Sequence, residues 1–158
     1  MISGCERDDI CAETTTTTPM LIIKFIDFES GVETNPPSEL EVQGTMVDEI
    51  LEVDSDPDSI LVPLRTDVPI TEYLLTINSD VDEDNTDDDT PNTDLLSIQY
   101  TPQDRYLSSA CGFITNFLGI TVTVPESMDE EDTRWIQNFS IEQDNVTDES
   151  SAHLYIFH

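Results

Sequence analysis

The stretch MLIIKFIDF, residues 20–28, decides which fold class this chain can adopt. Apolar residues occupy both odd and even positions in it, as in a strand that is covered on both faces. Pro19 stands directly before it, and proline prevents a helix while permitting the start of a strand. We therefore expect residues 20–28 to form the central strand of a β-sheet.

The rest of the chain consists of short apolar runs separated by turn residues. The runs follow one another about every eight to twelve positions, a spacing that is typical of antiparallel sandwiches and barrels. In ITEYLLTIN, residues 70–78, apolar and polar residues alternate as in a half-buried strand. We expect an all-β domain, an antiparallel β-sandwich or partly open barrel of about eight to nine strands. The other expected strands are ELEVQG, SILVPL, LLSIQY, ITVTV, WIQNFSI and HLYIF.

Two segments carry helical signals that compete with this interpretation. In YLSSACGFITNFL, residues 106–118, the apolar residues fit helical spacing as well as strand spacing, although Gly112 weakens a helix. We expect a strand that continues to Cys111 and is followed by an irregular or single-turn stretch. Ser127 to Glu130 matches a capping box, for which we expect at most one short helical turn.

The charge of the chain excludes nucleic acid as a partner. The sequence has 35 Asp and Glu residues against 5 Lys and Arg, which gives a formal net charge of −30. Binding to nucleic acid depends on clustered Lys and Arg side chains that displace counterions from phosphates, and here these residues are scattered singly. We interpret the acidity as an aid to solubility, tolerated in salty water because salt screens the repulsion between carboxylates.

Cys5 is predicted to be a lipidation site. The chain has 3 cysteines, and an odd count in an exported protein requires a separate role for one of them. Ile2, Ser3 and Gly4 before this cysteine resemble the lipobox at the end of a bacterial lipoprotein signal peptide, where small residues let a peptidase close around the backbone. We expect the charged start and the apolar stretch of that signal peptide to precede Met1 in the natural precursor.

The two other cysteines, Cys11 and Cys111, are predicted to form a disulfide. Once the first cysteine carries lipid, an even pair remains in an oxidising compartment, where disulfides are expected. The alternative is two buried free thiols, which behave as small apolar groups. Because Asp8 and Asp9 lie close to Cys11, burial of this cysteine is disfavoured and we favour the disulfide.

The segment ETTTTTPM, residues 13–20, has the composition of a spacer. Its threonine run cannot form a core, and its proline blocks a helix. We divide the chain accordingly: residues 1–19 hold the lipobox, the lipidation site and the Thr-rich tether, and residues 20–158 form a single β domain. The total of 158 residues fits one domain with a real core.

Several short motifs occur in order along the chain. They are CERDDIC at residues 5–11, the Thr-Pro start of LIIKF, the SIQY run and ACG at residues 110–112. In these motifs the chain resembles an uncharacterised family of lipoproteins from Bacteroidota, flavobacteria in particular. The resemblance implies a lipid-anchored protein of the outer membrane, on its periplasmic or cell-surface face, and it implies no activity. Arg7, Asp8 and Asp9 are similar to the signal that sends such lipoproteins to the outer leaflet.

The acidic stretch DVDEDNTDDDT, residues 80–90, has the alternate spacing of a calcium loop. Asp80, Asp82, Asp84 and Asp88 are the candidate ligands. The match to an EF-hand loop is incomplete, because asparagine stands where the glycine is needed and Pro91 stands where the bidentate glutamate is needed. We therefore expect a solvated hairpin loop rather than a metal site, and we expect no cofactor.

No catalytic residue can be assigned from the sequence. The two histidines, His153 and His158, lie at the end of the chain without a nucleophile motif beside them. Glycosidase chemistry needs one carboxyl group with a raised pKa in an apolar cleft, which spacing does not reveal. The aromatic residues are expected to be core or cross-strand pairs rather than a platform for stacking carbohydrate; they are Tyr73, Tyr100, Tyr106, Trp135 and Tyr155.

These observations predict a non-enzymatic binding or structural module of the cell envelope. Its predicted partners are the membrane, through a lipid on Cys5, and an unknown protein or glycan. The alternatives are a glycan-directed hydrolase of the cell envelope and a calcium-binding module. A deep pocket with two carboxylates of shifted pKa would favour the hydrolase, whereas a flat surface with an apolar patch would favour the binding module.

Overall fold

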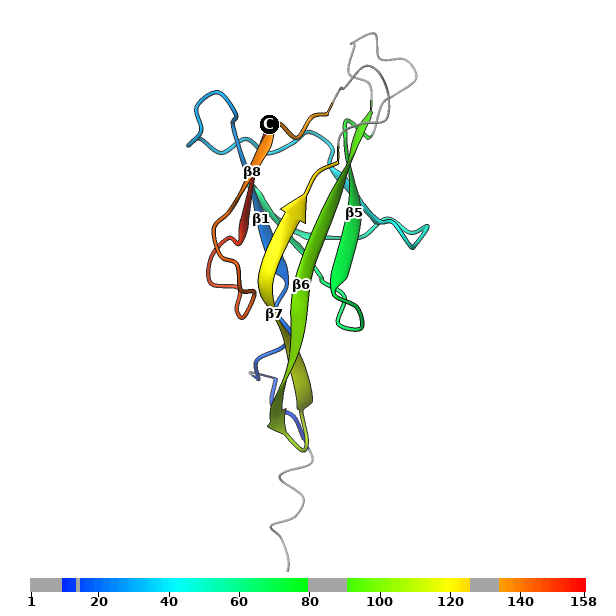
Figure 1. Ribbon diagram of the computed structural model, residues 1–158, viewed down its shortest axis with the longest axis vertical. Coiled ribbons are helices and arrows are strands. Elements are labelled where there is room, and N and C mark those ends of the chain that lie inside the picture. The colour runs from blue at the N-terminus through cyan, green and yellow to red at the C-terminus, as the bar shows by residue number, and fades with distance from the viewer. Residues whose placement is uncertain (1–9, 14, 80–90, 126–133) are drawn as a thin grey trace, which may run out of the picture.

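The chain folds into two β-sheets that pack face to face (Figure 1). This computed structural model describes residues 10–13, 15–79, 91–125 and 134–158, and these residues contain no helix. The helical turn expected at Ser127 to Glu130 lies outside them. The strands are β1 (Leu21–Ile26), β2 (Glu41–Gly44), β3 (Asp54–Asp56), β4 (Ser59–Val62), β5 (Ile70–Ile77), β6 (Asn92–Ser108), β7 (Gly112–Thr123), β8 (Asn138–Ile141) and β9 (Leu154–Phe157).

The strand order confirms the predicted all-β sandwich. One sheet has the order β3-β4-β1-β9-β8 and the other has the order β2-β5-β6-β7, so β1 is the central strand of its sheet, as predicted. The expectation of purely antiparallel pairing is wrong for β1 and β9, which run parallel with Ile23 opposite Leu154. Alternating apolar residues identify a strand but not its direction, and the long stretch of chain between β1 and β9 allows them to pair in parallel.

The hydrophobic core lies between the two sheets. In β1 the side chains of Leu21, Ile23 and Phe25 are buried, whereas Ile22 and Lys24 are half-buried. The expected burial of β1 on both faces is therefore wrong, because a two-sheet sandwich has a single interior. The second sheet and the segment before β8 complete the core with Val42, Tyr73, Leu75, Leu96, Ile98, Tyr100, Phe117, Ile120, Val122, Trp135 and Ile136.

Strands β6 and β7 form a long hairpin whose far half projects from the sandwich (Figure 1). The chain reverses at residues 109–111, and β7 begins at Gly112, whose φ of 71° is easily adopted by glycine. The strand expected to continue to Cys111 and the irregular or single-turn stretch expected after it are therefore wrong. Both mistakes have one cause, which is that the reversing residues lack a strong turn signature.

The connection between β8 and β9 covers the outer edge of β7. Phe117 and Val146 exchange two backbone hydrogen bonds of 3.1 and 2.7 Å, and the N–H of Ile120 donates to the carbonyl of Asp144 at 2.7 Å. Val146 itself is fully buried. This contact satisfies part of an edge that would otherwise be open, and it links the two sheets along one side.

Candidate functional site

The structure contains the predicted disulfide between Cys11 and Cys111. The two Cα atoms lie 4.9 Å apart, and 100 positions of sequence separate the residues. Cys111 belongs to the turn between β6 and β7, so the bond fastens the N-terminal segment to the end of the projecting hairpin. Cys5 lies outside the described residues, and its lipidation stays a prediction.

The threonine-rich segment runs beside the hairpin rather than away from it. The backbone N–H of Thr115 in β7 donates to the hydroxyl of Thr18 at 3.1 Å. The hydroxyl of Thr115 in turn donates to the Asp104 carboxylate of β6 at 3.0 Å. The segment before β1 is therefore attached near both of its ends, through the disulfide and through Thr18.

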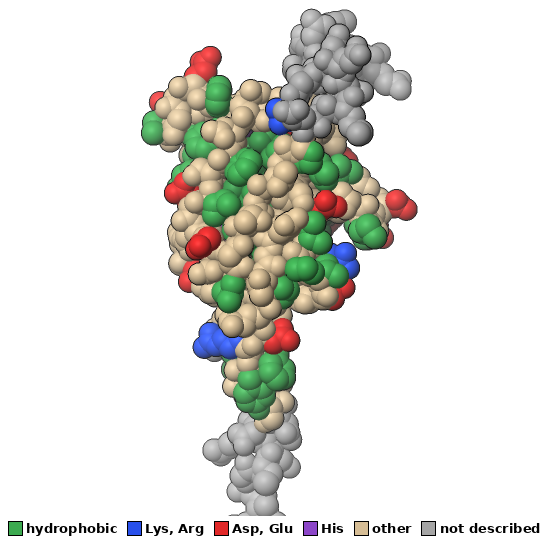
Figure 2. All heavy atoms as spheres, viewed as in Figure 1, with side chains coloured by type: hydrophobic (Ala, Val, Ile, Leu, Met, Phe, Trp, Pro, Cys, Tyr) green, Lys and Arg blue, Asp and Glu red, His purple; other side chains and the backbone are tan. Residues whose placement is uncertain are grey.

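The end of the hairpin carries exposed apolar side chains. Tyr106 and Phe113 are cross-strand partners whose rings lie 5.2 Å apart, and they are 58% and 65% exposed. Because side chains alternate along a strand, Phe113 lies on the same face of β7 as the fully buried Phe117. Thr115 and its cross-strand partner Asp104 lie between them on that face, so Tyr106 and Phe113 form a separate apolar pair nearer the end of the hairpin. Figure 2 shows hydrophobic side chains gathered on this projecting part.

Ile10 adds a third apolar side chain to this end of the molecule. It directly precedes Cys11 of the disulfide, and it is 79% exposed. We refer to Ile10, Tyr106 and Phe113 together as the hairpin tip. No pattern in the sequence predicted this surface.

A second surface feature is an open groove between the loop after β2 and the start of β5. Its volume is about 1270 Å³. Exposed apolar side chains of the loop, Met46, Val47 and Ile50, form one wall. Arg65 and Tyr73 also line the groove. We refer to this feature as the loop groove.

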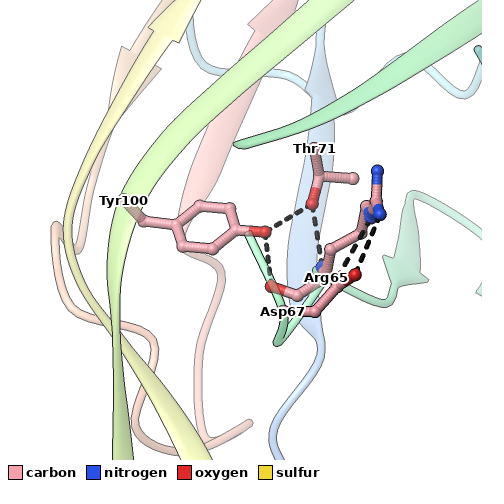
Figure 3. A network of polar contacts seen from close by, with 4 residues as sticks. All are labelled: Arg65, Asp67, Thr71 and Tyr100. Carbon is pink, nitrogen blue, oxygen red and sulfur yellow. Dashed lines mark hydrogen bonds and ion pairs between the residues drawn. The ribbon is translucent and has the colours of Figure 1, made fainter. Parts of the chain in front are cut away.

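Beneath the loop groove, a ring of hydrogen bonds fixes the backbone at Arg65 (Figure 3). The N–H of Arg65 donates to the hydroxyl of Thr71 at 2.8 Å, and the hydroxyl of Tyr100 donates to the carbonyl of Arg65 at 2.7 Å. The hydroxyls of Thr71 and Tyr100 lie 2.6 Å apart and close the ring. Each of the three residues thus fixes the other two.

The guanidinium group of Arg65 pairs with a neighbouring carboxylate. Its Nη2 atom lies 3.0 Å from Oδ2 of Asp67, and its Nε atom donates to Oδ1 at 3.3 Å. The hydrogen bond from Arg65 holds the pKa of Asp67 below its usual value. The pair places a positive and a negative group together beside the apolar wall of the loop groove.

The tyrosines near the loop groove serve as structural donors. The hydroxyl of Tyr73 donates to the carbonyl of Pro63, and burial raises the pKa of Tyr73 to about 12. Burial also raises the pKa of Tyr100. Both hydroxyls therefore stay protonated at neutral pH, so neither can act as a general base there.

The aromatic residues considered for a sugar-stacking platform occupy separate positions in the fold instead. Tyr73, Tyr100 and Trp135 belong to the buried core, and the indole N–H of Trp135 donates to the carbonyl of Leu75 at 3.1 Å. Tyr106 forms the cross-strand pair at the hairpin tip. The expectation of core and cross-strand positions is confirmed for these four residues, while Tyr155 is half-buried in β9.

Both histidines hold separate segments of the chain together. His153 is fully buried; its Nδ1 atom accepts from the N–H of Ile22 at 2.9 Å, and its Nε2 atom lies 2.9 Å from the carbonyl of Asp148. Burial lowers the pKa of His153, so the ring is neutral. The Nε2 atom of His158 lies 2.6 Å from the carbonyl of Asn35. These partners assign both rings to structural roles.

The described acidic residues support neither a calcium site nor the raised pKa of a hydrolase general acid. Among the residues that the structure describes, no group of three or more His, Cys, Asp and Glu could hold a metal ion. The candidate ligands Asp80, Asp82, Asp84 and Asp88 lie outside the described residues. Hydrogen bonds from Ser150 lower the pKa of Asp148, as Arg65 does for Asp67, which is the reverse of the shift that a general acid needs.

Comparison with known proteins places the chain in a family. Residues 39–158 match a family of unknown function, DUF6452. The chain belongs to this family. The match includes the whole second sheet and Cys111, whereas β1 and Cys11 precede it. Searches among curated proteins and among solved structures found no match. Within the described ranges, no helix has the length and apolar character needed to cross a membrane.

Proposed function

We propose that this DUF6452 protein is a lipoprotein of the cell envelope, anchored through a lipid on Cys5. The observation that carries the proposal is the disulfide between Cys11 and Cys111. It uses two of the 3 cysteines and leaves Cys5 as the odd one, directly behind the small residues Ser3 and Gly4. Disulfides form in exported proteins, and bacterial lipoproteins with a lipobox cysteine are exported proteins.

The proposed location is the outer membrane, on its periplasmic or cell-surface face. Support comes from the resemblance of residues 5–11 to lipoproteins of Bacteroidota, in which acidic residues after the lipidated cysteine direct export to the outer leaflet. The strong net negative charge opposes binding to an anionic membrane surface, but an acyl anchor overcomes this repulsion. Each buried methylene of an acyl chain contributes about 0.8 kcal/mol, so two or three chains outweigh the repulsion from an anionic surface.

The proposed role at that membrane is binding or structural rather than catalytic. The side chains with perturbed pKa values have structural partners: Tyr73 and His153 hold backbone groups, and Asp67 pairs with Arg65. The loop groove offers an apolar wall next to a charged pair, which suits a protein or glycan partner better than a reaction that needs a proton donor.

Fractionation of the natural host tests the anchor. The wild-type protein should sediment with membranes, and the Cys5→Ser variant should be released into the soluble fraction. The double variant Cys11→Ser, Cys111→Ser serves as the matched control, since it also removes cysteines but keeps the lipid, and it should remain in the membrane fraction. Quantitative membrane association of Cys5→Ser would refute the proposal.

A further inference from the structure

Within the part of the chain that the structure describes, the hairpin tip is an apolar surface that the sandwich does not cover. Tyr106 and Phe113 contact each other but extend past the sandwich, and Ile10 is the most exposed of the three side chains. Substitution of polar residues at these positions would not disturb the core, since none of the three belongs to it. The sequence nevertheless places large apolar groups here, which is typical of a surface that contacts another phase or molecule.

The disulfide limits how far this tip can lie from Cys5. Cys5 precedes Cys11 by 6 positions, and each residue spans at most about 3.6 Å when fully extended. A lipid on Cys5 therefore cannot lie more than about 22 Å from the Cys11 backbone. The Cα of Cys111 is only 4.9 Å from that of Cys11, so the turn between β6 and β7 is held within the same short distance of the bilayer.

The charge distribution fits this placement. The chain has 35 acidic residues, yet residues 105–125, which include the turn and the whole of β7, contain none. Among the described residues, the acidic ones nearest to the tip in sequence are Asp104 and Glu13. The carboxylate of Asp104 accepts a hydrogen bond from Thr115. Asp8 and Asp9 directly precede Ile10, so the part of this end that lacks carboxylates is the turn and β7. Carboxylates are repelled by anionic lipid headgroups, so the turn and β7 can approach a membrane more closely than the acidic segments of the chain can.

We propose that the hairpin tip lies in the interfacial layer of the bilayer to which Cys5 is anchored, so that the sandwich stands on the membrane with the tip downward. The proposal rests on the lipid anchor proposed above. The chemistry of the side chains suits this layer: a tyrosine ring enters the apolar side while its hydroxyl stays hydrated, and phenylalanine and isoleucine enter more fully. The exposed side chains of the hairpin tip then lie in an apolar environment, and the sandwich has a fixed orientation relative to the membrane.

The test attaches a lipid chemically, so that it does not depend on lipidation in the host. Because Cys11 and Cys111 are bonded to each other, Cys5 is the one free thiol of the full chain and couples to maleimide-bearing lipid in phosphatidylcholine vesicles. A Phe113→Trp variant places a fluorophore at the tip, and lipids with brominated acyl chains quench tryptophan that reaches the bilayer. The buried Trp135 supplies the background in the unsubstituted chain and reports whether the variant is folded.

The matched control is Val32→Trp, which changes another exposed apolar residue, in the loop between β1 and β2. This loop contacts the C-terminus through the hydrogen bond from Phe28 to His158, at the end of the molecule opposite the hairpin (Figure 1). We expect brominated lipid to reduce the emission of Phe113→Trp and to shift it to shorter wavelength, and to leave Val32→Trp unchanged.

Equal emission with and without brominated chains in Phe113→Trp would overturn the proposal and indicate that the tip faces water or another protein. Equal quenching in both variants would also overturn it, because the domain would then have no fixed orientation. Neither result would affect the lipid anchor, which is refuted separately by membrane association of Cys5→Ser in the host.

Discussion

Removing the Cys11–Cys111 disulfide should destabilise the protein without changing its fold. The bond closes a loop of 100 positions that contains every strand from β1 to β6. For a loop of this length, the restriction of the unfolded chain contributes about 4.7 kcal/mol to the free energy of unfolding. Cys11 precedes β1 and Cys111 lies in a turn, so no strand needs the bond for its pairing. The effect should therefore fall on the unfolded chain.

Urea denaturation measures this contribution. All proteins carry Cys5→Ser to prevent mispairing, and the double variant Cys11→Ser, Cys111→Ser is compared with the oxidised parent. We expect a loss of about 4 to 5 kcal/mol and a midpoint of thermal unfolding lower by about 10–20 °C. A loss below about 1 kcal/mol would contradict the reasoning. It would mean that the hairpin end and the N-terminal segment separate before the core unfolds, so that the loop does not restrict the unfolding chain.

Three further predictions concern single groups and the overall charge. Burial lowers the pKa of His153 below its usual 6.5, so as the pH falls this histidine is protonated in the unfolded chain before it is protonated in the folded one. The free energy of unfolding should therefore be constant with respect to this group above about pH 6.5 and should decline below it. The His153→Asn variant should lose that decline in urea titrations at pH 7 and pH 5. Conversely, burial raises the pKa of Tyr73 from 10.0 to about 12, so stability should fall as the pH rises above 10. The Tyr73→Phe variant should lose this alkaline decline. At neutral pH the variant should be less stable by about 1–3 kcal/mol, because the Pro63 carbonyl loses its donor. Finally, the net charge of −30 should make stability rise smoothly with NaCl or CaCl₂. One-to-one calcium binding in high salt that is abolished by Asp82→Asn and Asp84→Asn, measured by calorimetry, would contradict this diffuse effect.

The strands were predictable because each sheet has one buried face. In β6, the residues Leu96, Ile98 and Tyr100 alternate with more polar neighbours, and all three are buried. The same period of two identifies β5 through Tyr73 and Leu75. This alternation is a local property of the chain, so it can be read without knowledge of which strand lies alongside.

The pairing of strands was harder to predict from the sequence, because it depends on contacts between distant residues. The parallel arrangement of β1 with β9 joins Ile23 to Leu154, and neither segment carries a signal of its partner or its direction. The turn at residues 109–111 was missed because it contains serine, alanine and cysteine rather than the usual Asn-Gly or Pro-Gly pairs. Only Gly112, with its positive φ, marked the place.

Of the features of the candidate site, one was predictable from the sequence and the others depended on contacts between distant residues. Counting cysteines predicted the disulfide, since an even remainder pairs in an oxidising compartment. The ring at Arg65, Thr71 and Tyr100 could not be predicted, because it joins residues from two strands and a loop. The hairpin tip depended on locating the turn, since Tyr106 and Phe113 face each other only when the chain reverses between them.

The lipid on Cys5 is the central claim, and mass spectrometry of protein purified from its natural host tests it most directly. After detergent extraction, removal of unbound lipid and proteolysis, we expect the N-terminal peptide to begin at Cys5. It should carry a mass increase equal to a diacylglyceryl group, with or without an additional acyl chain. A peptide that retains residues 1–4, or one in which Cys5 is a free thiol that reacts with iodoacetamide, would contradict it.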